Sequence, residues 1–143
     1  MKSLLNIALA AALLAPAPAL AASATPSATP SAATQKEFAA FIAKFRAALK
    51  ANDAAAIAGM TKYPFMDARN GQYFTVRNAE QFRAQSYARN FTPKNRACVL
   101  KNKAVYDRVD AGDGYYSIFC GALMFTFVKT PKGFLFENIG AND

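Results

Sequence analysis

The chain has 143 residues, 53% of them hydrophobic and 13% aromatic, and a formal net charge of +8. This length suits one domain around one hydrophobic core. The sequence contains no histidine and two cysteines, so thiol and metal chemistry lack their commonest partner, and we expect no metal and no cofactor.

The first 21 residues have the pattern of a secretory signal peptide. Lys2 precedes an apolar run from Leu4 to Ala15, and the small-residue sequence Ala19-Leu20-Ala21 ends the segment. The run is about 12 residues long, whereas a membrane span needs about 20. Pro16 and Pro18 follow it directly. We therefore expect a periplasmic or secreted protein without a stable membrane anchor.

The next segment, Ala22 to Ala33, is a low-complexity stretch with the sequence ASATPSATPSAA. It offers almost no apolar surface to bury, so it predicts a disordered linker. The predicted domain is Thr34 to Asp143. All twelve phenylalanines and all six tyrosines lie after residue 37, so aromatic rings can fill a core or line a pocket in this domain.

Two helices are predicted at the start of the domain. Thr34-Gln35-Lys36-Glu37 matches a capping box, which predicts that a helix begins there. Its apolar residues recur with helical spacing and form one face: Phe38, Phe41, Ile42, Phe45 and Leu49. Asp53 is expected to cap a short second helix, Ala54 to Ala58, which Gly59 ends.

A hairpin and a third helix follow. Tyr63 to Asp67 and Tyr73 to Val76 are rich in strand-forming residues and flank Asn70-Gly71, a strong hairpin turn sequence. Asn78 to about Asn90 predicts a capped helix. Thr92-Pro93 is expected to break it.

The rest of the chain predicts a meander of strands. We expect strands at Cys98 to Tyr106, Tyr115 to Lys129 and Phe134 to Ile139, with turns at Asp110 to Gly114 and Pro131 to Gly133. These boundaries follow the clusters of Gly, Pro and Asp between the apolar runs.

The long strand is apolar at both alternating sets of positions, so both of its faces should be covered. Gly121 at its centre suggests a bulge or a sharp bend. We expect the helices to cover one face, and either the curvature of the sheet or a second copy of the chain to cover the other. The predicted homodimer contact lies around Ile118, Met124 and Val128.

This order of elements resembles the nuclear transport factor 2-like superfamily. Local sequences are also similar to exported bacterial members: Asn52-Asp53-Ala54-Ala55, Tyr63-Pro64-Phe65, Ala79-Glu80-Gln81-Phe82 and Phe91-Thr92-Pro93. The resemblance extends from Thr34 to Gly140. It implies a cone-shaped, cystatin-like α+β domain, in which a curved antiparallel sheet wraps around an N-terminal helix and two shorter helices and leaves a cavity. The superfamily includes isomerases, dehydratases, hydrolases and binding proteins without enzymatic activity.

Cys98 and Cys120 are the only cysteines of a chain expected in an oxidising compartment. A disulfide between them is the favoured interpretation, and a pair of buried free thiols is the alternative.

Six residues are candidates for a ligand pocket, and we expect no catalytic set among them: Tyr63, Asp67, Tyr73, Phe119, Phe125 and Glu137. Asp67 is either a turn carboxylate paired with Arg69 or a general base. Glu137 faces either solvent or the cavity, because successive strand residues alternate between faces.

Between Lys62 and Arg108 the chain carries ten basic residues and three acidic ones. Such a region attracts anions, although a basic surface also serves solubility alone. An exported protein rarely meets nucleic acid. We therefore expect a non-enzymatic binding protein whose aromatic cavity and basic surface take a small anionic or apolar ligand. One alternative is an immunity or inhibitor protein whose partner is an acidic protein. The other is a lyase or isomerase that uses Asp67 or Glu137.

Overall fold

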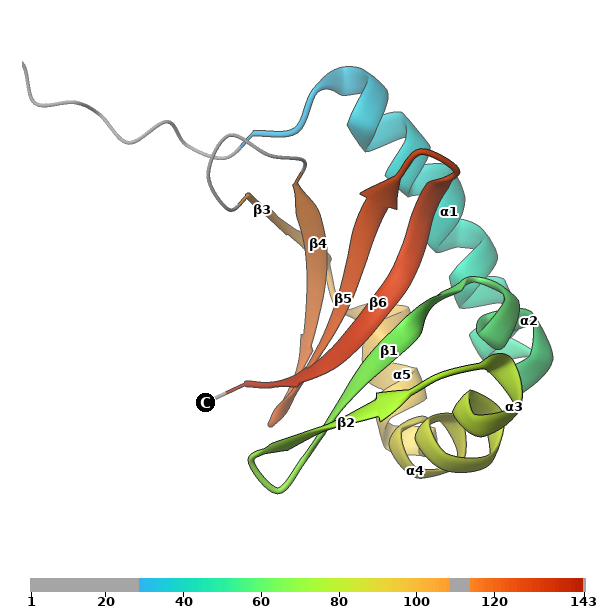
Figure 1. Cartoon of the computed structure of the whole chain (residues 1–143). Coiled ribbons are helices and arrows are strands. Elements are labelled where there is room, and N and C mark those ends of the chain that lie inside the picture. Colours follow the sequence, from blue (N-terminus) through green and yellow to red (C-terminus); the bar gives the residue numbers. More distant parts are fainter. Residues whose placement is uncertain (1–28, 109–113, 143) are drawn as a thin grey trace, which may run out of the picture.

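The computed structural model describes residues 29–108 and 114–142. Its helices lie on one side of a curved sheet (Figure 1). Six strands are described, with the spatial order β2-β1-β6-β5-β4-β3. Their bounds are β1 Thr61–Arg69, β2 Gln72–Val76, β3 Val105–Asp107, β4 Tyr115–Cys120, β5 Leu123–Thr130 and β6 Gly133–Ala141.

The predicted α+β fold with a curved sheet is confirmed, with one difference in strand direction. Four neighbouring pairs are antiparallel, but β1 and β6 run parallel. A parallel pair needs a long connection, which the helices and the other strands supply here. The sheet is therefore mixed rather than wholly antiparallel.

The helical segments are α1 Ala32–Lys50, α2 Ala54–Gly59, α3 Ala79–Gln81, η1 Phe82–Tyr87, α4 Ala88–Asn90 and α5 Pro93–Lys101. The predicted third helix is confirmed as the continuous run α3-η1-α4. Asn78 caps it by accepting a hydrogen bond from the Gln81 backbone N–H at 2.9 Å. Its central part, η1, is a π-helix, which nothing in the apolar pattern distinguishes from an α-helix.

Helix α1 begins earlier than the predicted capping box. Ser31 is the N-cap, and its hydroxyl accepts from the Thr34 backbone N–H at 3.1 Å. Serine caps a helix at least as well as threonine, and the two alanines at 32 and 33 favour helix strongly. The end of the predicted linker is thus helical. Residues 1–28, with the predicted signal peptide and most of the linker, lie outside the described residues, as does most of the predicted turn at 110–114.

The predicted strand Cys98 to Tyr106 is wrong. Its first part, Cys98 to Lys101, belongs to α5, and only its last two residues, Val105 and Tyr106, lie in a strand, β3. Thr92 caps α5 by accepting from the Asn95 backbone N–H at 3.3 Å, and Pro93 occupies the first turn. Proline fits there because the first helical residue needs no N–H partner. The residues that end one helix therefore begin the next.

The predicted long strand, Tyr115 to Lys129, is also wrong. It is a hairpin of β4 and β5, with Gly121 at φ +64° in a two-residue turn. Because of this turn, even-numbered residues of β4 share a face with odd-numbered residues of β5. Ile118 pairs with Phe125 in the core, while Met124 lies on the opposite face with Phe119. Because Ile118 is fully buried within the monomer, it cannot contribute to the predicted dimer contact. The homodimer itself stays a prediction.

Phenylalanine rings fill the space between α1 and the sheet. Phe45 packs edge-on against Phe127, with ring centroids 5.0 Å apart, and against Phe136 at 5.3 Å. The predicted apolar face of α1 is confirmed, with Phe45 fully buried at its centre. Cys98 on α5 and Cys120 on β4 form the predicted disulfide, with 2.09 Å between the Sγ atoms.

Candidate functional site

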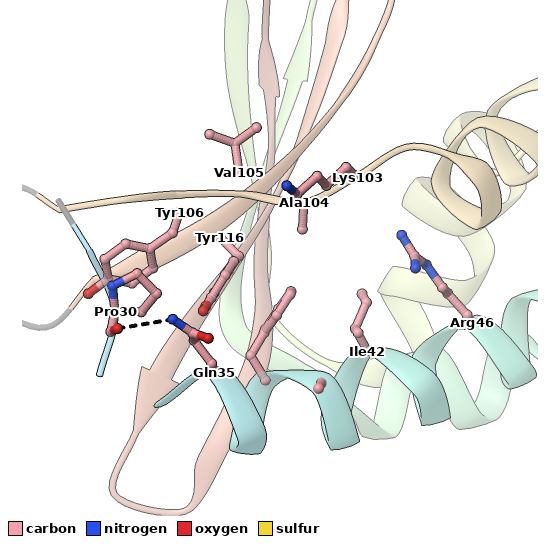
Figure 2. A pocket seen from close by; sticks show the side chains of 11 residues that line it. Pro30, Gln35, Ile42, Arg46, Lys103, Ala104, Val105, Tyr106 and Tyr116 are labelled. Carbon is pink, nitrogen blue, oxygen red and sulfur yellow. Dashed lines mark hydrogen bonds between the residues drawn. The ribbon is translucent and has the colours of Figure 1, made fainter. Parts of the chain in front are cut away.

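The largest of the described cavities lies between α1 and the sheet edge formed by β3 and β4 (Figure 2). We call it the α1–β3 cavity. Its volume is about 630 Å³, within the range of small-molecule sites. It is lined by Pro30, Gln35, Phe38, Ala39, Ile42 and Arg46 on one side and by Lys103, Ala104, Val105, Tyr106 and Tyr116 on the other.

One wall of this cavity is aromatic. The rings of Phe38 and Tyr116 are stacked, with centroids 3.6 Å apart and planes at 3°, and the Tyr106 ring lies 5.0 Å from Tyr116. Phe38 and Tyr116 are nearly buried, so the wall is held in place by the core. Burial raises the pKa of Tyr116 above the ordinary phenol value, so its hydroxyl stays protonated at neutral pH. The wall is therefore uncharged and largely apolar, and Tyr106 is its most exposed ring.

The other end of the cavity is positively charged. Figure 2 shows Arg46 at the end away from Gln35 and the tyrosines, and Lys103 beside Ala104, between Arg46 and the tyrosines. Arg46 donates from Nε to the Val99 carbonyl at 3.0 Å and from Nη2 to the Asn102 carbonyl at 2.6 Å. These carbonyls at the end of α5 carry no net charge, so the guanidinium is positioned but not neutralised. The described lining residues include no carboxylate.

The six predicted pocket residues do not line this cavity, and the structure does not bring them together. Tyr63 is half-buried and donates its hydroxyl to the Ala58 carbonyl at 3.0 Å. Phe125 belongs to the core. Tyr73 and Phe119 lie on the surface, with exposed fractions of 59% and 40%.

Asp67 is fully buried on β1 rather than placed in a turn. Its Oδ2 accepts from the Ser86 hydroxyl at 2.6 Å and from the Arg89 guanidinium, and its Oδ1 accepts from the Asn90 amide at 3.0 Å. The predicted partner, Arg69, is a second ion-pair partner, with Nη2 3.6 Å from Oδ2. A carboxylate held by three donors away from the cavity is suited to join β1 to the helical run, not to accept a proton from a ligand.

Glu137 pairs with Lys62 across 2.6 Å, and both side chains are partly exposed. The glutamate lies where the pairing of β5 and β6 shifts by one residue. This position fits the solvent-facing alternative better than the cavity-facing one.

Sequence reasoning missed Arg46 and Lys103 as a pair. Arg46 follows Ile42 by four residues, which places it beside the apolar face of α1. That position indicates a charge at the edge of the core. Lys103, which also lines the cavity, lies 57 positions further along the chain, so the spacing does not connect the two residues.

Comparisons with known proteins identify solved structures of low similarity. No protein-family model and no curated protein matches the sequence. One similar solved structure is a protein of unknown function from the DUF3225 family of Pectobacterium atrosepticum, at 16% identity and a TM-score of 0.43, covering 79% of this chain and 94% of that one. Another is a "putative ketosteroid isomerase" from Shewanella frigidimarina, at 14% identity and a TM-score of 0.41, covering 74% and 94%.

The curved sheet and the packing of α1 in the present structure agree with the α+β architecture that the sequence resemblance implies. At these identities and TM-scores the two matches say nothing about chemistry.

Proposed function

We propose that the protein is an exported binding protein whose α1–β3 cavity takes a small molecule with an apolar ring and an acidic group. One observation carries this proposal: an aromatic wall and two cationic side chains share a single cavity whose described lining has no carboxylate. Apolar contact with the aromatic wall favours the ring of such a ligand, and the charges of Arg46 and Lys103 favour its acidic group. The surfaces around Asp67 and Glu137 offer no comparable combination.

Export is supported by the signal-peptide pattern of the first 21 residues and by the disulfide, since disulfides persist in oxidising compartments. Within residues 29–108 and 114–142, no helix has both the length and the apolar character needed to cross a bilayer.

A fluorescence titration with 8-anilino-1-naphthalenesulfonate tests the proposal, because this probe combines an aromatic system with a sulfonate. Ala39 lines the cavity from an exposed position on α1, so Ala39→Trp adds bulk to the cavity without disturbing the core. We expect Ala39→Trp to weaken binding at least about tenfold, because a filled cavity excludes the probe.

Ala47→Trp is the matched control, since Ala47 is also exposed on α1 but lines none of the described cavities. It should leave the affinity unchanged. Equal effects of the two substitutions, or full affinity in Ala39→Trp, would place the probe elsewhere and contradict the proposal.

A second variant tests the charged end of the cavity. Lys103→Gln should weaken binding of the sulfonate probe about three- to tenfold at low salt. The same variant should bind N-phenyl-1-naphthylamine, which lacks the sulfonate, as well as the original protein does. Loss of both probes to the same degree would show that Lys103 acts through packing rather than through charge.

A further inference from the structure

A second cavity, of about 500 Å³, lies at the opposite end of the sheet from the α1–β3 cavity. The β1–β2 hairpin, the β4–β5 turn and the end of β6 come together in this region (Figure 1). Arg69 of β1 and Arg89 of α4 both line it, and we call it the Arg69–Arg89 cleft. It shares no lining residue with the α1–β3 cavity.

The charges at this cleft do not balance. Asp67 lies behind it, fully buried, and its Oδ2 already accepts from Ser86 and Arg89. Arg69 stays at 3.6 Å from that oxygen, beyond hydrogen-bond distance. One carboxylate thus faces two guanidinium groups, and the described residues that line the cleft include no other acid. Among these described residues, an excess of one positive charge remains at the wall of the Arg69–Arg89 cleft.

The guanidinium of Arg69 also has unused donors. Among the described residues, its Nε and Nη2 atoms are buried and have no hydrogen-bond partner. Its Cζ atom lies 4.5 Å from the centroid of the Phe74 ring, so one face of the group is stacked. A charged donor without an acceptor is unfavourable when it is buried. Nε and Nη2 form the side of a guanidinium that binds two oxygens of one anion. Because 26% of the side chain is exposed, a change of rotamer can turn these atoms toward the cleft.

Neutral amides complete the wall. Asn70, Asn90 and Asn142 line the cleft, and Asn142 is fixed by its backbone N–H to the Ala122 carbonyl at 2.9 Å. We infer that the Arg69–Arg89 cleft binds the oxyanion group of a small molecule, a carboxylate or a phosphate, through the guanidinium of Arg69. This inference does not depend on the function proposed for the α1–β3 cavity.

Isothermal titration calorimetry with citrate and with inorganic phosphate tests the inference. We expect binding of at least one of them, weakened by added sodium chloride, and lost at least about tenfold in Arg69→Gln. The melting temperature of Arg69→Gln without anion should stay within about 4 °C of the original, because Asp67 keeps its hydrogen bonds to Ser86, Arg89 and Asn90 in that variant. Citrate binding alone would assign the site to carboxylates, and phosphate binding alone would assign it to phosphates.

Arg77→Gln is the matched control, because Arg77 is exposed and lies outside the cleft while the substitution removes the same charge. It should retain binding. Equal losses in the two variants would show a general charge effect and overturn the inference, as would the absence of binding by both anions.

Discussion

Replacing Asp67 by asparagine should destabilise the fold strongly. The substitution keeps the shape of the side chain but leaves Arg89 and Arg69 without their counter-charge. Removing one partner of a buried ion pair typically costs about 3–5 kcal/mol. The side chains of Arg89 and Arg69 are 38% and 26% exposed and can turn partly toward water, so we expect the low end, about 3 kcal/mol.

Urea denaturation measures this effect. With an m-value of about 1.5 kcal/mol/M, a loss of about 3 kcal/mol lowers the midpoint by about 2 M. Glu137→Gln is the control, because it removes the other candidate carboxylate from a partly exposed ion pair with Lys62. Such pairs contribute at most about 1 kcal/mol, so its midpoint should move by less than about 0.7 M. Equal midpoints for the two variants would refute the structural role that we assign to Asp67.

Three further predictions concern the core, the disulfide and the tyrosine wall. Phe45→Ala should cost about 4 kcal/mol in urea titrations, whereas Lys44→Ala, on the exposed side of α1, should cost less than about 0.5. Intact mass after alkylation should show no modified thiol before reduction, and reduction of the bond between Cys98 and Cys120 should lower stability by about 3 kcal/mol. Since burial raises the pKa of Tyr116, stability present below pH 10 should decline as the pH rises through that higher folded-state value. A Tyr116→Phe variant with an equally steep decline in urea midpoint would contradict this.

Local sequence signals predicted the elements that depend on local physics. The hairpin turn was predictable because Asn70 and Gly71 adopt the left-handed conformation, with φ of +50° and +75°, that a two-residue hairpin requires. The face of α1 followed from its helical spacing of apolar residues, and the disulfide from the oxidising compartment that the leader implies.

The elements that sequence reasoning missed lack a distinctive local pattern. The turn at Gly121 joins two strands that are both apolar, so no polar segment marks the boundary. Thr92-Pro93 lies between two helices, and the sequence predicts only the end of the first, because threonine before proline fits both a helix end and a helix start.

The candidate site was the least predictable part. The residues of its walls form no motif in the sequence. The cavity exists only because α1 packs across the edge formed by β3 and β4. Asp67 was noticed as a carboxylate beside Arg69, but its burial depends on Arg89 and Asn90, which reach it from a helical run about 20 positions away. Such contacts are set by tertiary packing and leave no trace in sequence spacing.

The central claim is that the α1–β3 cavity holds the ligand, and mapping the probe on the protein tests it most directly. Two-dimensional NMR of the ¹⁵N-labelled protein, titrated with 8-anilino-1-naphthalenesulfonate, reports which backbone amides sense the probe. We predict the largest shifts at the amides of Ala39, Arg46 and Tyr106, which line the cavity from both sides. Shifts confined to Tyr73 and Phe74, the exposed aromatic residues of β2, would place the probe on the surface and contradict the account.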